Sequence, residues 1–147
     1  MSLQTVLLAV GADDADRVEA LAQAVRDVAG PAGASVVIAH VFTEEQFAEV
    51  TERMDFDGNA DPDEVAARHG TVRELRAAFE GSGIDISVRG SVGDHGAGVV
   101  DLCGAVGADM VFVGGRRRSP TGKAVFGSTA QEILLEAPCP VTFVRSE

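Results

Sequence analysis

The run Thr5–Val10 (TVLLAV) constrains the fold of this 147-residue chain more than any other segment. Its residues are aliphatic or β-branched, and after Thr5 no polar residue alternates with them, as one would in a strand with one face in water. A continuous apolar run of this length is typical of a strand covered on both faces. The run Ser35–Phe42 (SVVIAHVF) has the same character. The chain is therefore predicted to contain a parallel sheet with buried central strands.

Helical patterns alternate with the strand-like runs. Asp13 and Asp14 stand where helix N-caps belong, and the apolar residues after them recur at helical spacing until Gly30-Pro31. The remaining predicted elements are, in chain order, a short helix over Thr43–Arg53, a loop over Asp55–Asp61, a helix from Pro62 to about Glu80, a strand over Ile84–Arg89, a turn over Gly90–His95, a helix over Ala97–Val106, a strand over Asp109–Val113, a helix from Gly127-Ser128 and a strand over Val141–Val144. This order predicts one α/β domain over residues 1–147, a doubly wound parallel five-stranded sheet with helices on both faces.

A basic, glycine-containing loop follows the strand predicted over Asp109–Val113. Gly114-Gly115 ends the strand, and Gly127-Ser128-Thr129 opens the next helix. Glycines let a ligand approach the backbone, and a helix N-terminus offers free N–H groups and a positive dipole to an anion. The loop holds four of the 12 basic residues of a chain with net charge −11, namely Arg116, Arg117, Arg118 and Lys123. Phosphate binding is the leading explanation; a solvated charge run and a docking patch for an acidic partner remain alternatives.

The composition limits the classes of function. Apolar residues make up 46% of the chain, which excludes wholesale disorder, and no apolar run has transmembrane length. No signal peptide is recognised, so a soluble, cytoplasmic protein is predicted. Acidic residues outnumber basic ones 23 to 12, and Lys123 is the only lysine. Such a surface suits a halophilic source or an ordinary acidic protein from a GC-rich genome, and it disfavours nucleic-acid binding.

Histidine and cysteine give no sign of a metal or redox site. His40, His69 and His95 lack the spacing of metal ligands, and His40 is predicted to pack in the core. Cys103 and Cys139 stand apart without a CxxC motif, which favours two small buried residues.

Five segments carry a resemblance to a known family. TVLLAV, IAHVF, ADMVFVGGRRR, FGSTAQEIL and APCPVTFV stand in the order and at the spacing of the universal stress protein family, and the resemblance covers essentially the whole chain. It implies a sheet of strand order 3-2-1-4-5, a cytoplasmic role in the stress response and a homodimer through the last strand, Val141–Val144. Open α/β sheets of this order bind ligands where the strand order reverses, at the carboxyl ends of strands one and four.

The resemblance also implies an ATP site, possibly with Mg²⁺. Phosphate would be held by Gly114, Gly115, Gly127, Ser128 and Thr129, helped by Arg116, Arg117 and Lys123. The backbone of Val41 would meet adenine. Asp13, next to Gly11, would meet ribose or metal. Two positions depart from the family's pattern: Arg117 replaces the second glycine of the phosphate motif, and Gly11 replaces the acid that usually follows the first strand.

Two alternative functions are therefore predicted. The first is a dimeric stress-response regulator that binds an adenine nucleotide. The second is a nucleotide-free dimeric interaction module with a degenerate ATP site. No residue is identified as a general base, so no catalytic residue is predicted and ATP hydrolysis is left open.

Overall fold

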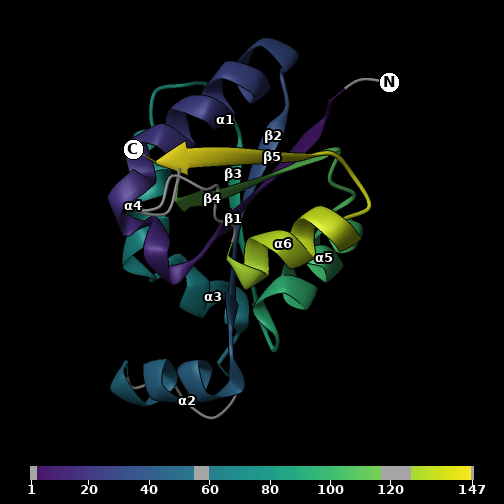
Figure 1. Cartoon of the computed structure of the whole chain (residues 1–147). Helices are drawn as coiled ribbons and strands as arrows, with labels where there is room; N and C mark the ends of the chain where they lie inside the picture. The colour runs from purple at the N-terminus through teal and green to yellow at the C-terminus, as the bar shows by residue number, and fades with distance from the viewer. Residues whose placement is uncertain (1–2, 55–59, 117–126, 147) are drawn as a thin grey trace.

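The computed structural model describes residues 3–54, 60–116 and 127–146 of the chain. Its centre is one parallel sheet in the order β3-β2-β1-β4-β5, which confirms the predicted fold class and strand order. The strands are β1 (Thr5–Val10), β2 (Ser35–Phe42), β3 (Ile86–Val92), β4 (Met110–Arg116) and β5 (Val141–Ser146). Figure 1 shows the strands fanning out with the usual twist of such a sheet.

The strand β1 lies at the centre of the sheet, as its apolar run predicts. Along β2 the pairing runs from Thr5 opposite Ser35 to Val10 opposite His40. Along β4 it runs from Val6 opposite Met110 to Leu8 opposite Phe112. Its side chains alternate between two separate hydrophobic cores: Val6 and Leu8 enter one, and Leu7 enters the other. All three are fully buried, which is why both faces of the strand must be apolar.

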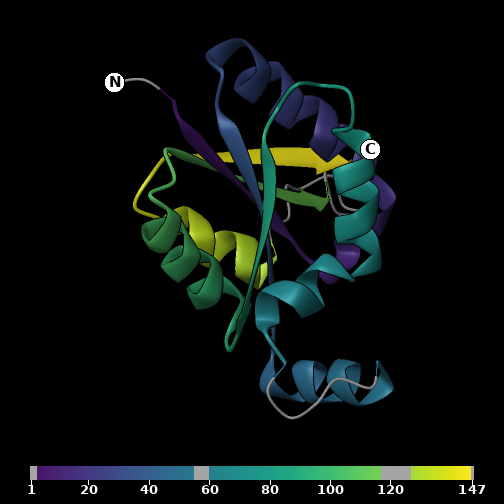
Figure 2. The same cartoon turned by 180° about the vertical axis from the view of Figure 1, so that it is seen from behind.

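Helices cover both faces of the sheet (Figures 1 and 2). On one face, α1 (Val18–Ala32) and α4 (Gly70–Ala78) contribute Leu21, Val25, Val72 and Leu75 to the first core. On the other face, α5 (His95–Val106) and α6 (Ser128–Glu136) contribute Val99, Leu102 and Ile133 to the second. Asp94 caps α5 by accepting a hydrogen bond from the Ala97 N–H, as expected of that residue type.

Two short helices, α2 (Glu44–Arg53) and α3 (Pro62–Ala67), lie between β2 and α4 in the chain. The helix α2 projects beyond the carboxyl end of β2 (Figure 1), and Thr43 and Gln46 form its capping box. The helix α3 packs on the outer edge of β3, where Asp63 Oδ1 accepts a hydrogen bond of 2.7 Å from the Gly90 N–H. The bare edge of β3 is thereby occupied at its middle.

Several helix boundaries in the structure differ from those predicted from the sequence. The helix expected to stop at Gly30-Pro31 runs to Ala32 and ends at Gly33, which adopts φ 68°. Pro31 lies in the last turn of α1, where it removes the one helical hydrogen bond that its own N–H would donate, and the helix ends one residue later. The first six residues of that segment, Ala12–Arg17, form a 3₁₀ helix, η1, rather than an α-helix.

Two further corrections concern tertiary contacts. The single helix expected over Pro62–Glu80 is broken into α3 and α4, because His69 adopts an extended backbone and stacks on His40. The strand β4 does not end before Gly114-Gly115, since both residues continue the ladder opposite Val144 and Arg145 of β5. The strand β3 begins and ends later than predicted, so the expected turn over Gly90–His95 is correspondingly shorter.

Candidate functional site at the switch point

The strands β1 and β4 are neighbours, but their connections lead to opposite halves of the sheet. The chain passes from β1 to β2 and from β4 to β5, which places the reversal of strand order between β1 and β4. We call the carboxyl ends of these two strands the switch point. In open α/β sheets this is the position where ligands bind, because the diverging connections leave the strand ends uncovered.

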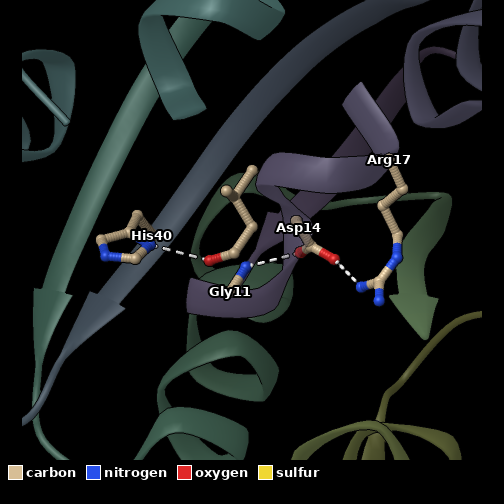
Figure 3. A network of polar contacts seen from close by, with 5 residues as sticks. Gly11, Asp14, Arg17 and His40 are labelled. Carbon is tan, nitrogen blue, oxygen red and sulfur yellow. Dashed lines mark hydrogen bonds and ion pairs between the residues drawn. The ribbon is translucent and has the colours of Figure 1, made fainter. Parts of the chain in front are cut away.

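A polar network built on η1 occupies the switch point (Figure 3). Asp14 turns back on the chain, and its Oδ2 accepts a hydrogen bond of 2.7 Å from the Gly11 N–H. Its Oδ1 lies 2.5 Å from Nη1 of Arg17. Asp14 and Arg17 are 4% and 8% exposed, so this is a buried ion pair. Asp13 is exposed to solvent.

The ion pair packs directly against Gly114 at the end of β4. A Cβ atom placed on Gly114 would lie 2.8 Å from Cδ of Arg17 and 2.9 Å from Oδ1 of Asp14. At Gly115 it would lie 2.5 Å from Cζ of Phe143. Both glycines are therefore required by contacts within the protein, in addition to any contact with a ligand.

The carboxyl end of β2 borders the same region. His40 pairs with Val10, the last residue of β1, so Val41 lies one residue beyond the β1 ladder. The Val41 side chain is buried against α5, where a Cβ on Gly98 would lie 2.8 Å from Cγ1 of Val41. What remains of Val41 near the switch point is its backbone, which is the part that the family resemblance implies would meet adenine.

His40 is a buried core residue, as predicted. Its Nδ1 donates a hydrogen bond of 2.8 Å to the Val10 carbonyl oxygen, which requires the proton on Nδ1 (Figure 3). Its ring centroid lies 4.1 Å from that of His69. Burial, and then the proximity of His69, lower the pKa of His40 to about 4. The residue is therefore neutral at neutral pH and acts as a fixed hydrogen-bond donor to the end of β1.

The remaining predicted site residues lie at the end of β4 and the start of α6. Gly127 is the N-cap of α6, and Ser128 and Thr129 open its first turn, with no acidic residue among them. Arg116 is the last residue of β4, with its backbone opposite Ser146. Arg117 and Lys123 lie outside the described residues, so their predicted roles stay predictions.

The described residues offer no ready-made metal site. No three His, Cys, Asp or Glu side chains within 3–54, 60–116 and 127–146 are grouped to hold an ion. Both oxygens of Asp14 are engaged by Gly11 and Arg17, which leaves Asp13 as the exposed carboxylate beside Gly11. A magnesium ion bound mainly through a ligand's phosphates needs only one or two such carboxylates.

Comparison with known protein families decides the relationship. The family model described as the universal stress protein family matches residues 2–145. The chain belongs to this family. A universal stress protein of Mycolicibacterium smegmatis is 36% identical over 89 residues, which are 60% of this chain and 68% of that protein. A universal stress protein of Thermus aquaticus, from the QAH/OAS sulfhydrylase 3′ region, is 28% identical over 97% of this chain and 98% of its own.

Solved structures of the family share the fold. A universal stress protein in complex with cAMP is 21% identical with a TM-score of 0.63, and each chain covers 100% of the other. One from Archaeoglobus fulgidus in complex with dAMP is 21% identical with a TM-score of 0.59, over 99% of this chain and 100% of that one. A family protein from Arabidopsis thaliana with AMP bound is 14% identical with a TM-score of 0.67, over 98% of this chain and 92% of that one.

Sequence reasoning missed Arg17. The pattern after Asp13 and Asp14 predicts a helix, and nothing in the sequence analysis singles out Arg17 within it. A signal was present, because an acid and an arginine three residues apart face each other on a helix. What the sequence did not reveal is that this pair points inward, against Gly114.

Proposed function

We propose that this chain binds an adenine nucleotide at the switch point and acts as a cytoplasmic, dimeric stress-response protein. The observation that carries the proposal is the meeting of polar groups and glycines at the carboxyl ends of β1 and β4, where Asp14 accepts a hydrogen bond from the Gly11 N–H and packs against Gly114. Relatives of the same family and fold have been solved with cAMP, dAMP and AMP. All three ligands contain adenine, a pentose and one phosphate, so this portion of the ligand is the best supported.

The proposed contacts follow the elements around the switch point. The backbone of Val41 would pair with adenine, and Asp13, beside Gly11, would meet ribose or a magnesium ion. The phosphates would lie near Gly114, Gly115 and the first turn of α6, whose free N–H groups attract anions. The phosphate-binding set is completed by Gly127, Ser128 and Thr129 and by the side chains of Arg116, Arg117 and Lys123. ATP, with Mg²⁺, is the proposed physiological form.

Titration calorimetry and thermal unfolding test this proposal. ATP, ADP and AMP should each bind saturably and raise the melting temperature, since a ligand that binds only the native state stabilises it by about 2.7 kcal/mol at a concentration 100 times its Kd. GTP is the matched control for adenine recognition and should bind at least tenfold more weakly. If millimolar ATP gives neither heat nor a melting shift, with or without Mg²⁺, the nucleotide proposal is wrong.

The variant Arg117→Gly separates two versions of the site. If Arg117 clamps phosphate, its loss should weaken ATP binding by roughly 1–3 kcal/mol, the scale of a charge-assisted hydrogen bond. If Arg117 obstructs the backbone, glycine should strengthen binding instead. Titration of both proteins under identical salt distinguishes the two.

The alternative function, a nucleotide-free interaction module, is favoured by one observation. The space above Gly114 and Gly115 is filled by Arg17, Asp14 and Phe143 rather than left open to a ligand. In that case the dimer through Val141–Val144 is the functional unit, and the same titrations would give no signal while the protein remained dimeric.

Within the described residues no helix is long and apolar enough to cross a membrane.

A further inference from the structure

We propose that Arg17 recognises the phosphate group of the bound nucleotide and so makes the chain select adenosine phosphates over adenosine. The inference rests on the proposed function, because it assigns a specificity-determining residue to the same site. Neither the composition of the basic loop nor the family's phosphate motif points to this residue. It is identified by its burial, its incomplete hydrogen bonding and its contact with Gly114.

The guanidinium of Arg17 is buried but only partly satisfied. It offers five N–H donors, and Asp14 is its one hydrogen-bond partner among the described residues. Its Nε is buried and has no hydrogen-bond partner there. An unpaired donor on a buried cation is unfavourable, because the group has lost water and gained nothing in return. An anion that reached the guanidinium would supply the missing acceptors.

Arg26, two turns further along in α1, provides the contrast. Its Nη1 donates to the Ala78 carbonyl oxygen at 2.7 Å, and its Nη2 donates to Gln23 at 3.1 Å. These contacts fix Arg26 between α1 and the end of α4, which is a structural task. Arg17 has no comparable backbone acceptor among the described residues, and Asp14 is its one hydrogen-bonding anchor there.

Asp14 acts as a positioning residue for Arg17. One of its oxygens is held by the Gly11 N–H and the other by Arg17, so the carboxylate is anchored to the end of β1 and presents the guanidinium to the end of β4. The arginine stem lies against Gly114, where a Cβ atom would be only 2.8 Å from its Cδ. The cation is thus held at the strand ends where ligands of open α/β sheets bind.

Phosphate is the group that this arrangement fits. A guanidinium forms paired, charge-assisted hydrogen bonds with phosphate oxygens. In a chain of net charge −11, a phosphate dianion is repelled by most of the surface and needs a local cation. Adenosine carries no charge and gains nothing from Arg17, which is why the residue would confer selectivity rather than general affinity.

The test compares AMP with adenosine by titration calorimetry at fixed salt, using the wild type, Arg17→Gln, Arg17→Lys and Arg26→Gln. The wild type should bind AMP at least tenfold more tightly than adenosine. Arg17→Gln should lose roughly 10- to 100-fold in AMP affinity, as expected for charge-assisted bonds, while adenosine affinity stays within about twofold. The AMP affinity of Arg17→Lys should lie between those of the wild type and Arg17→Gln. The AMP and adenosine affinities of Arg26→Gln should match those of the wild type.

Several results would overturn the inference. If Arg17→Gln keeps full AMP affinity, or loses AMP and adenosine equally, Arg17 is only the structural partner of Asp14. If the wild type binds adenosine and AMP with equal affinity, the proposed function survives and this inference fails. If the wild type binds neither adenosine nor AMP, the proposed function and this inference both fail. Circular dichroism and thermal unfolding check each variant, and if Arg17→Gln does not fold, the same criteria apply to Arg17→Lys, which keeps the buried charge.

Discussion

The imidazole of His40 in β2 is hydrogen-bonded across 2.8 Å to the carbonyl oxygen of Val10, the last residue of β1. This bond ties together the carboxyl ends of two central strands, one residue before the Gly11–Asp14 contact. The Nδ1–H donor is present in both protonation states of the ring, but burial beside a second histidine disfavours the charged form and lowers the pKa of His40. The stability of the switch point is therefore linked to pH.

The unfolding free energy should decrease in mild acid. Because the pKa of His40 is lowered from 6.5 to about 4, its contribution is complete above pH 6.5 and is lost as the pH falls toward 4. The unfolded chain binds a proton in that window that the native chain does not, which costs on the order of 3 kcal/mol. Urea denaturation at pH 7 and pH 4.5 measures the loss. His40→Gln should reduce the pH dependence, and an identical dependence in both proteins would contradict the assignment.

The carboxyl of Glu132 should destabilise the native state when ionised. Partial burial first, and then the neighbouring Asp94, raise its pKa. Native Glu132 therefore retains its proton at a pH where the unfolded chain has lost it, and stability falls as the pH rises through that window. Glu132→Gln should raise the melting temperature at pH 7, and the gain should vanish at pH 3. A lower melting temperature at pH 7 would show that the carboxylate is stabilising.

Substitution of Gly114 by alanine should disturb the switch point. The new methyl group would press on Arg17 and Asp14 at less than 3 Å, so we expect a loss of about 1–3 kcal/mol in unfolding free energy. Gly104 in α5 is the matched control, because it is exposed and its Cβ position is open. Gly104→Ala should instead gain about 0.5–1 kcal/mol from helix propensity. Equal effects at both sites in urea denaturation would refute the packing role of Gly114.

The proposed dimer should depend on the outer edge of β5. The Val111 N–H donates to the Pro140 carbonyl oxygen, so in a parallel ladder the N–H of Thr142 faces β4 and that of Val141 faces outward. Val141→Pro removes this outward donor and should give monomers in sedimentation, with Thr142→Ala as the control that keeps the edge. Lysine at Val141 or Phe143 is a poorer test, because both side chains pack against the core under α5 and α6. An unchanged dimer would place the interface elsewhere.

Much of the fold could be predicted because the central strands carry their own signal. The bounds of β1 and β2 match the apolar runs residue for residue, since burial on both faces favours apolar side chains at almost every position, with the hydrogen-bonded His40 as the buried polar exception. The break between α3 and α4 could not be predicted in this way. It is set by the contact of His69 with His40, far away in the sequence.

The candidate site likewise has a part that the sequence predicts and a part that it does not. Gly11 and Gly114 both stand out in the sequence because each follows an apolar run, and both lie near the switch point, although only Gly11 follows its strand while Gly114 lies within β4. The inward turn of Asp14 and Arg17 depends on η1 being a 3₁₀ helix, whose tighter winding redirects the side chains. Sequence periodicity assumes α-helical winding from the first turn, so it cannot report this.

The contact of Asp63 with Gly90 has a consequence for assembly. The sheet has two outer strands, and the outward N–H of Gly90 on one of them is already taken by a carboxylate of α3. Addition of a further strand is thus hindered at the middle of β3. A dimer that pairs β5 of one copy with β5 of the other, as proposed above, would leave the two hindered β3 strands as its outer edges. A third copy could not then be added by strand pairing at β3.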